Sequence, residues 1–379
     1  MVDVLVINAG SSSIKAAVFS DGMTLRLSAS VSEIGGAATL RIRSTTEPVE
    51  AADHGAALSQ LLAAFATQGM RLADLAAAGH RVVHGGQTLI RPELINPNIE
   101  RAIEACIPLA PLHNPHNLSA IRALATLVPG LPQVACFDTG FHATNPEVAR
   151  RYAIPAAEDA AGIRRYGFHG ISYESLVDHL PALIGAPLPA RLLALHLGNG
   201  ASLCAIRDGR SAATTMGYSP LDGLTMGTRA GSIDGNAVLR LAEQHGIDGA
   251  ARILNRESGL LALGGASDMR SLAGAGTDDA RFAIAHFCYW VVRHSGSMIA
   301  AMGGLDAVAF TGGIGENDAA VRAEILAGLG WAGLAADAAA NRAGAPRLHA
   351  EGSRVRAWIV PAEEERHIAA AALRCLGSS

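Results

Sequence analysis

Two apolar segments separated by a short polar one open the chain. Residues 4–7 are apolar, residues 8–13 are small or polar, and a second apolar run begins at Ile14 and ends at Asp21-Gly22. This pattern predicts a β-hairpin over residues 4–22 with a tip rich in glycine and serine. Backbone N–H groups and hydroxyls at such a tip suit a phosphate, although an ordinary hairpin turn has the same pattern.

The same pattern returns halfway along the chain. Residues 192–209 again hold two apolar runs around a Gly/Asn/Ser turn, and Asp208-Gly209 ends them. Repetition at this spacing predicts duplication of a domain rather than a repeat array. We therefore expect an α/β fold of two similar domains, residues 1–148 completed by 362–379 and residues 149–361, with a nucleotide bound in a cleft between them.

The segments between and after the hairpins alternate between helical and strand patterns. Helical spacing predicts helices over residues 54–65, 234–244 and 280–302, the last apolar on most sides. The prolines of residues 108–117 predict a rigid loop, followed by a helix over 118–127. Short strands are expected at residues 134–137 and 357–360. A strand at residues 307–310 should enter a glycine-rich turn at 311–317, a second candidate phosphate platform.

Four polar residues stand at positions that favour catalysis. Arg81 and Val83 share one strand face at a Gly-Gly exit, which suits an anion beside an apolar wall, although an edge-strand arginine would look the same. Asp138 ends a buried strand, where open α/β sheets place catalytic groups, or else it caps the next helix. His169 precedes a helix N-terminus, where it binds an anion or caps the helix. Arg229 lies in a long Gly/Thr-rich loop and is expected to form an anion clamp with Arg81.

Composition narrows the functional classes. A chain of 379 residues predicts two domains, and a net charge of −4 without a basic stripe argues against nucleic acid. No apolar stretch approaches the ~20 residues of a membrane helix, and no leader pattern opens the chain, so we expect a cytoplasmic protein without membrane contact. The five scattered cysteines suggest neither disulfides nor zinc. Lys15 is the one lysine, a compact ammonium at the first hairpin.

Motifs along nearly the whole chain resemble those of the acetate kinases, a family of the acetate and sugar kinase, Hsp70 and actin superfamily. The matching stretches read NAGSSSIK, GHRVVHGG, PLHNP, FDTGFH, RYGFHG, HLGNGAS, PLDGLTMGTRAG, SDMR and FTGGIGEN. The resemblance implies two duplicated ribonuclease H-like (actin-like ATPase) domains with an interdomain active-site cleft. It also implies a homodimer that transfers phosphate from ATP to acetate, giving acetyl phosphate and ADP, with Mg²⁺, or Mn²⁺, as the metal.

The resemblance also implies roles for the matching residues. The catalytic set would be Arg81, Asp138, His169 and Arg229. The acetate site would consist of Arg81, Val83, Leu112, His113, Phe168 and Pro220. The ATP site would consist of Ser11, Ser13, Lys15, His196, Leu197, Gly198, Asn199, Gly200, Asp268, Met269, Arg270, Gly312, Gly313, Ile314, Gly315, Glu316 and Asn317. The metal would be held by Asn8 and Glu364, the latter assigned by counting from Pro361.

Two alternatives remain at this point. A kinase of this family could prefer propionate or butyrate, because one methylene in an apolar pocket changes selectivity by only ~1–3 kcal/mol. A protein of a different functional class, a nucleotide-driven binding module like Hsp70 or actin, could also have this fold. Such a module needs a partner-binding domain or a polymer surface, and the sequence offers no extra segment for either.

Overall fold

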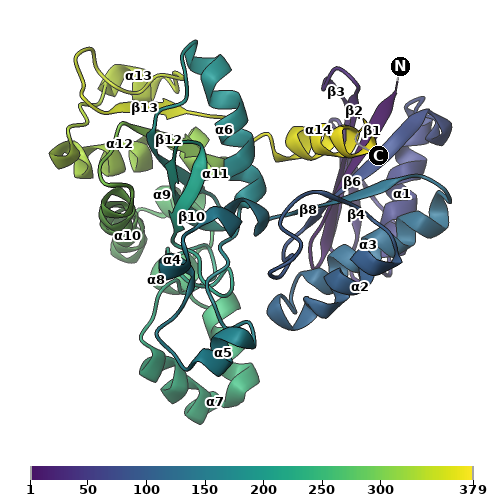
Figure 1. Ribbon diagram of the computed structural model, residues 1–379, viewed down its shortest axis with the longest axis horizontal. Coiled ribbons are helices and arrows are strands. Elements are labelled where there is room, and N and C mark those ends of the chain that lie inside the picture. Colours follow the sequence, from purple (N-terminus) through teal and green to yellow (C-terminus); the bar gives the residue numbers. More distant parts are fainter. Residues whose placement is uncertain (1, 378–379) are drawn as a thin grey trace. The chain divides into compact units, whose positions relative to one another are not determined.

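A computed structural model describes residues 2–377, which form two compact units. Unit 1 holds the chain up to Phe141 together with the C-terminal segment from Glu363, and unit 2 holds His142–Ala362. The first boundary follows strand β8 (Gln133–Phe137), earlier in the chain than the expected position after residue 148. Figure 1 shows the elements of each unit.

Unit 1 is built on an eight-stranded sheet of order β5-β4-β3-β2-β1-β6-β8-β7. Strands β1 to β5 pair antiparallel in sequence order, whereas β1, β6 and β8 run parallel. The predicted first hairpin is confirmed as β1 and β2. The other strands, with β8 given above, are β1 (Asp3–Ala9), β2 (Ser13–Ser20), β3 (Leu25–Ser32), β4 (Thr39–Ile42), β5 (Thr45–Pro48), β6 (Leu75–Val82) and β7 (Glu93–Leu94).

Helices cover both faces of this sheet. On one face, α1 (His54–Thr67) and α3 (Asn114–Leu127) enclose a core that includes Leu5, Leu58 and Leu124, and α2 (Pro97–Ala105) packs beside α3. Burying each leucine contributes roughly 1.5–3 kcal/mol. On the other face, α14 (Glu364–Gly377) lies against β1 and β6, where Gly79 leaves room for Ile368. Alternation along β1 therefore turns Leu5 toward α1 and α3, and Asn8 toward the α14 face.

Helix α3 begins earlier than the sequence predicted. We expected a loop over residues 108–117, but α3 starts at Asn114 and carries Pro115 in its first turn. The first-turn N–H groups have no partner within a helix, so proline at that place costs no hydrogen bond. The expectation was therefore wrong for residues 114–117, and both Asn114 and Asn117 project from a helix.

Unit 2 repeats the central strands of unit 1. Its sheet has the order β11-β10-β9-β12-β13, with β9 to β11 antiparallel and β9, β12 and β13 parallel, which matches β3-β2-β1-β6-β8. The register pairs His196 with Ser202 as it pairs Asn8 with Lys15 in the first hairpin. The expected second hairpin and the duplication are thus present. The strands are β9 (Arg191–Leu197), β10 (Ala201–Arg207), β11 (Arg210–Thr214), β12 (Ala307–Thr311) and β13 (Arg356–Ile359).

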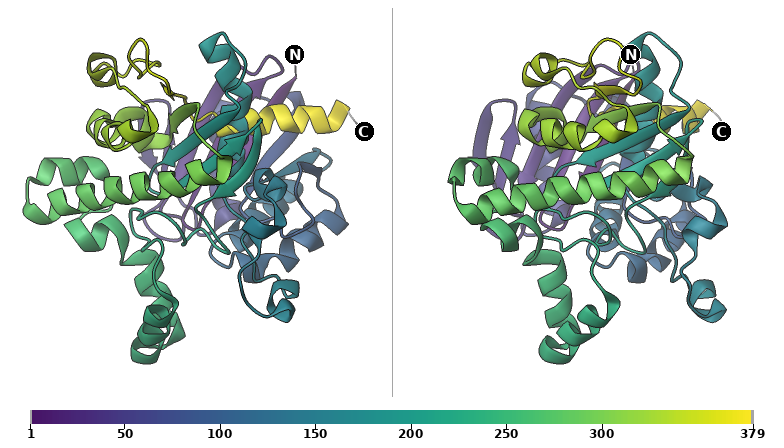
Figure 2. Two further views of the ribbon diagram at one scale, coloured as in Figure 1. Left: turned by 60° about the vertical axis from the view of Figure 1, so that its left-hand side comes forward. Right: turned by 90° about the vertical axis from the view of Figure 1, so that its left-hand side faces the viewer.

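The helices of unit 2 include the long α10 and the kinked α7, which projects from its unit in Figure 2. Gly246 has non-helical angles and divides α7. The stretch 312–317, expected as an open turn, is the short helix α11. The helices are α4 (Glu147–Arg150), α5 (Ala156–Ala160), α6 (Gly170–Ile184), α7 (Gly235–Arg256), α8 (Gly259–Gly264), α9 (Met269–Ala275), α10 (Asp278–Met302), α11 (Gly312–Asn317), α12 (Ala319–Gly328) and α13 (Ala338–Arg342).

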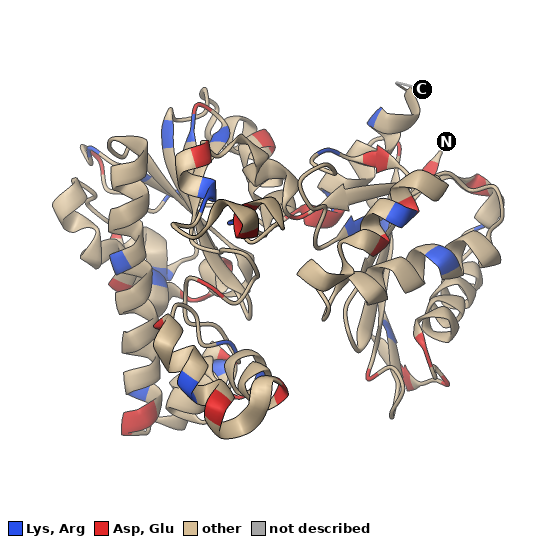
Figure 3. Cartoon of the chain, turned by 60° about the horizontal axis from the view of Figure 1, so that its bottom comes forward, with Lys and Arg blue, Asp and Glu red and all other residues tan. Residues whose placement is uncertain are grey.

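The surface charges of the two units are mixed. Figure 3 shows acidic and basic residues interspersed over the helices and strands of each unit. Among residues 2–377, none of the helices combines the length and the apolar character that a membrane crossing requires.

Candidate active site

Four polar side chains gather at the strand ends of unit 1. Asn8 lies opposite Lys15 in the hairpin, and the parallel register of β1 and β6 brings Arg81 beside Asn8. Arg81 in turn pairs with Cys136 on β8, two residues before Asp138. Because alternate residues of a strand share a face, all four lie on the α14 face of the sheet. Four strands, β1, β2, β6 and β8, thus bring together residues far apart in the sequence.

Arg81 is held by two neighbours. Its Nε lies 3.1 Å from both carboxylate oxygens of Asp138, its Nη2 donates to Asp138 Oδ2 at 2.5 Å, and its Nη1 donates to Asn8 Oδ1 at 3.3 Å. Burial lowers the pKa of Arg81, but the charge and hydrogen bonds of Asp138 raise it by more, so the guanidinium stays charged. These bonds use three of its five N–H groups. Two remain to bind a carboxylate or phosphate.

The first turn of α14 adds carboxylates to this face. The charge of Glu364 also raises the pKa of Arg81. Burial raises the pKa of Glu365, an effect that Lys15 opposes and Glu364 increases. The described residues contain no group of three or more His, Cys, Asp or Glu side chains that could hold a metal.

Two asparagines of α3, which the sequence analysis did not assign, fix the strand ends from the opposite face. Asn117 Nδ2 donates to the Ala9 carbonyl at 2.8 Å, and the Val83 N–H donates to Asn117 Oδ1 at 3.1 Å. Asn114 makes the equivalent pair of bonds with the backbone of His84, at 3.1 and 3.0 Å. Both amides are buried. Their three-residue spacing was the available signal, but the expected loop concealed it.

In unit 2, His169 and Arg229 meet at Gly200. A Cβ built on Gly200 would lie 3.2 Å from His169 Nε2 and 3.3 Å from Arg229 Nη2. His169 occupies the N-cap position of α6 in the left-handed conformation, with φ of 60°, and its side chain makes no capping hydrogen bond. Its ring stacks on His196 at 4.2 Å. Arg229 Nη1 donates to the Pro220 carbonyl at 2.7 Å. An imidazole and a guanidinium directed at one glycine can stabilise a negatively charged group there.

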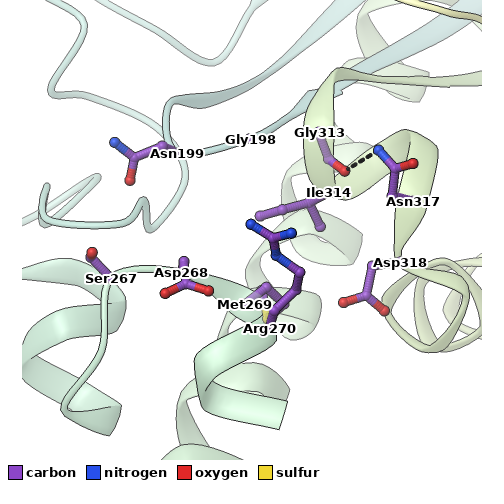
Figure 4. Close-up of a pocket in the computed structure, with 10 residues that line it drawn as sticks. All are labelled: Gly198, Asn199, Ser267, Asp268, Met269, Arg270, Gly313, Ile314, Asn317 and Asp318. Atoms are coloured by element: carbon purple, nitrogen blue, oxygen red, sulfur yellow. Dashed lines mark hydrogen bonds between the residues drawn. The ribbon is translucent and has the colours of Figure 1, made fainter. Parts of the chain in front are cut away.

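A pocket of about 340 Å³ opens nearby in unit 2. In Figure 4 the side chain of Arg270 extends into it toward Ile314, and Asn317 Nδ2 donates to the Gly313 carbonyl at 2.9 Å. Its volume is at the small end of the range for ligand sites. It is lined by Gly198, Asn199, Ser267, Asp268, Met269, Arg270, Gly313, Ile314, Asn317 and Asp318.

Eight of the 17 expected nucleotide residues line this pocket. Ser267, the first residue of the SDMR stretch, and Asp318, the N-cap of α12, also line the pocket, although neither had been assigned a role. Glu316 turns its carboxylate to the backbone, since its Oε1 accepts from the N–H groups of Gly312 and Ala362, both at 3.0 Å. The expected residues outside the lining are His196, Leu197, Gly200, Gly312, Gly315 and Glu316 in unit 2, and Ser11, Ser13 and Lys15 in unit 1.

The expected acetate-site residues belong to both units. In unit 1, Val83 is buried, Leu112 is 41% exposed, and His113 is the N-cap residue of α3. In unit 2, Phe168 is buried and Pro220 accepts the hydrogen bond from Arg229.

The five-stranded core that occurs in both units is that of duplicated ribonuclease H-like domains, and the match to a kinase family makes the chain a phosphotransferase. Residues 3–370 match the model of the acetokinase family. The chain belongs to this family.

Similarity extends over nearly the whole length of individual relatives. The chain is 41% identical to the acetate kinase of Methylocella silvestris, covering 97% of this chain and 96% of the relative. The crystal structure of Porphyromonas gingivalis acetate kinase has 32% identity and a TM-score of 0.92, covering 99% and 100%. A propionate kinase from Francisella tularensis has 34% identity and a TM-score of 0.93 over the same shares. Family and relatives together support acetate kinase activity, an ATP-using phosphotransfer.

Proposed function

We propose that the enzyme catalyses reversible, Mg²⁺-dependent transfer of the γ-phosphoryl group of ATP to acetate, giving acetyl phosphate and ADP by direct in-line displacement. An acetate oxygen forms the bond to phosphorus while the bond to the ADP oxygen breaks and leaves its electron pair on ADP. Such a transfer needs positioning and charge neutralisation rather than covalent catalysis. The observation that carries the proposal is Arg81, fixed by Asp138 and Asn8 with two N–H groups left for a carboxylate.

Arg81 binds the acetate carboxylate in this proposal. Asp138 is 2% exposed and orients the guanidinium. It is not needed as a base, because acetate is ionised and nucleophilic at neutral pH. The methyl group of acetate would contact apolar surface, and the residues proposed for this are Val83, Leu112, His113, Phe168 and Pro220.

A substitution of Asn117 tests whether its hydrogen bonds to the strand ends position the acetate site. Asn117→Asp keeps the acceptor for the Val83 N–H but places a carboxylate oxygen against the Ala9 carbonyl. Leaving a buried group unpaired costs about 1–3 kcal/mol, so we expect lower stability in urea and about a tenfold lower kcat/KM for acetate. Asn255→Asp, at an amide that binds a helix carbonyl near the surface, should change neither. Unaltered kinetics in Asn117→Asp would refute a role in positioning the site.

The oxygen donors of unit 1 suit Mg²⁺, which is usually bound by one or two carboxylates together with substrate phosphates. Asn8 and Glu364 are the residues proposed to hold it, and Mn²⁺ could replace it. When bound, the metal would neutralise charge on the phosphate oxygens. The charge of Glu364 also helps to raise the pKa of Arg81, the proposed acetate ligand.

The pocket of unit 2 is proposed to hold the nucleotide, with Asp268, Met269 and Arg270 at the adenosine. The glycine-rich ends of β9 and α11 would approach the phosphates, because glycine lets the backbone come close. From unit 1, we propose that Ser11, Ser13 and Lys15 also bind phosphate. His169 and Arg229 would stabilise the transferring group. Dependence on ATP is also why we propose a cytoplasmic location.

Gly227 supplies a second test. A Cβ at residue 227 would lie 1.8 Å from Asn199 Oδ1 and 2.7 Å from the Ser267 carbonyl, both of which line the pocket. Overpacking of this kind costs about 1–3 kcal/mol, so Gly227→Ala should raise KM for ATP about tenfold. Gly235→Ala, where a Cβ meets nothing within 4 Å, is the matched control. Unchanged ATP kinetics in Gly227→Ala would argue against this pocket as the nucleotide site.

We also propose a homodimer formed through α10. Phe282 and Tyr289 are 58% and 64% exposed and lie two turns apart, on one face of the helix. Tyr289→Asp would bury a charge in that interface and should give monomers in sedimentation velocity. Val148→Asp, at a 90% exposed residue of α4, should leave the dimer intact. A wild-type monomer at micromolar concentration would disprove the proposal.

A second candidate is a preference for propionate or butyrate. The Francisella tularensis neighbour named a propionate kinase resembles this chain as closely in fold as the acetate kinase does. One methylene changes selectivity by about 1–3 kcal/mol, so a small enlargement beside Val83 would be sufficient.

One assay tests both candidates. Acyl phosphate is trapped with hydroxylamine and measured with ATP and Mg²⁺ against acetate, propionate and butyrate. The proposal predicts the highest kcat/KM for acetate. A higher value for propionate or butyrate would favour the second candidate, and no acyl phosphate from any of the three acids would refute phosphotransfer to carboxylates.

A further inference from the structure

Behind His169 lies a pair of buried hydroxyls to which the proposed mechanism gives no role. Ser202 Oγ lies 2.9 Å from His169 Nδ1 and 2.6 Å from the hydroxyl of Tyr173. Ser202 and Tyr173, from β10 and α6, are fully buried. Ser202 contacts the ring nitrogen opposite to the one that lies near Gly200, and Tyr173 contacts Ser202.

The distances fit a chain of hydrogen bonds that runs from the phenol of Tyr173 through Ser202 to His169. Burial, with the nearby Cys204, raises the pKa of Tyr173 well above its usual value, although Ser202 and the backbone of His196 oppose this. The phenol is therefore neutral, and in the arrangement that we infer it donates its proton to Ser202 Oγ, 2.6 Å away. The single serine proton is then directed to its other partner, His169 Nδ1. A neutral imidazole whose Nδ1 accepts a hydrogen bond carries its own proton on Nε2.

We propose that Ser202 and Tyr173 are positioning residues that hold His169 in the tautomer protonated on Nε2. The ring then presents an N–H donor, beside Arg229, to the transferring phosphoryl group. This proposal rests on the proposed function only for what His169 does. The tautomer itself depends on contacts within unit 2.

A second serine–histidine pair in the same unit, Ser211 and His142, has a similar hydrogen bond, and there the donor and the acceptor can be assigned. His142 Nε2 lies 2.9 Å from the Phe168 carbonyl, which only accepts, and His142 Nδ1 lies 2.8 Å from Ser211 Oγ. Burial lowers the pKa of His142 to about 4, so the ring is neutral and carries its proton on Nε2. His142 is therefore an internal reference for the tautomer inferred at His169.

The ring of His169 is also fixed in orientation. It stacks on His196, which pairs with Ser202 across the hairpin and whose Nδ1 lies 2.8 Å from Ser172 Oγ. The positive φ of His169 is a conformation that non-glycine residues rarely adopt, and it sets the direction in which the side chain leaves the chain. Because the ring cannot turn freely, its two nitrogens keep the same hydrogen-bond partners.

Nitrogen NMR of ¹⁵N-histidine-labelled protein tests the tautomer directly, with His169→Ala to assign the signals. We expect His169 to match His142, with Nε2 protonated and Nδ1 not. Ser202→Ala should give a mixture of tautomers at His169, whereas Ser211→Ala, the matched loss of a serine at His142, should leave the His169 signals in place. A proton on Nδ1 in the wild type, or unchanged His169 signals in Ser202→Ala, would overturn the proposal.

A double-mutant cycle measures the consequence for turnover. Ser202→Ala should lower kcat about tenfold, and Tyr173→Phe, which keeps the ring and its packing, by a smaller factor, with KM for both substrates nearly unchanged. In a His169→Ala background, Ser202→Ala should cause no further loss, because Ser202 acts through His169. The same fractional loss in both backgrounds would mean structural damage and overturn the proposal. Failure of the wild type to form any acyl phosphate would refute the proposed function, while the NMR result would still decide the tautomer.

Discussion

Arg81→Ala is expected to lower kcat/KM for acetate by about 10²–10⁴, the largest loss from any single change proposed for this enzyme. The substitution removes the charged donor to acetate and also leaves the buried Asp138 without its partner. Truncating one partner of a hydrogen-bonded charge pair, here the guanidinium that binds the acetate carboxylate, costs about 2–5 kcal/mol of binding, and each 1.36 kcal/mol is tenfold. The measurement is initial-rate kinetics with acetate varied at saturating ATP. KM for ATP should change far less, since Arg81 is proposed to bind acetate.

Two related variants separate charge from shape in the Arg81–Asp138 pair, and a third is the control. Arg81→Lys keeps the charge but cannot reproduce the forked contacts to Asp138, so it should recover only part of the activity. Asp138→Asn keeps the shape but weakens the anchor, and it should lose less than Arg81→Ala. Arg26→Ala, at the half-exposed arginine that pairs with Asp3, is the control for losing an arginine from unit 1. A wild-type KM for acetate in Arg81→Ala would contradict the assigned role.

The second large effect is expected in unit 2. His169→Ala or Arg229→Ala should lower kcat by about 10²–10³, because removing one donor to developing charge typically has this effect. The two side chains meet at Gly200, and they are proposed to act on the transferring group rather than on the adenosine. KM for ATP should therefore rise much less than kcat falls. Steady-state kinetics in both directions, with ADP and acetyl phosphate as the reverse pair, gives this comparison.

Gly200→Ala provides an independent view of the same position. Its Cβ would press on both His169 Nε2 and Arg229 Nη2 without removing either group, so a fall in kcat is expected from displacement alone. The control is Gly274→Ala, at an α9 glycine with nothing within 4 Å of an added Cβ. Wild-type turnover in either His169→Ala or Arg229→Ala would contradict the assignment of these residues.

The hydrophobic pattern by itself predicted the two hairpins and their duplication, because strands buried on both faces show up as apolar runs bounded by turn residues. The long helix α10 was also visible from its periodicity. The expectation that the prolines of residues 108–117 exclude a helix was wrong at the start of α3, because proline is tolerated in the first turn of a helix but not in its interior. Residues 312–317 were expected as an open turn and form a helix, because glycine content alone does not distinguish the two.

The sequence by itself determined the α/β class, the internal duplication and the types of side chain available for binding anions. Only the tertiary structure decided which of them meet. Parallel pairing of β1, β6 and β8 sets Asn8, Arg81 and Asp138 side by side, and sheet register is not encoded locally. The Asn117 bonds to Ala9 and Val83, and the hydroxyls of Ser202 and Tyr173 behind His169, likewise join segments distant in sequence. Hydrogen bonds between such segments depend on packing of the whole unit, so no local sequence motif predicts them.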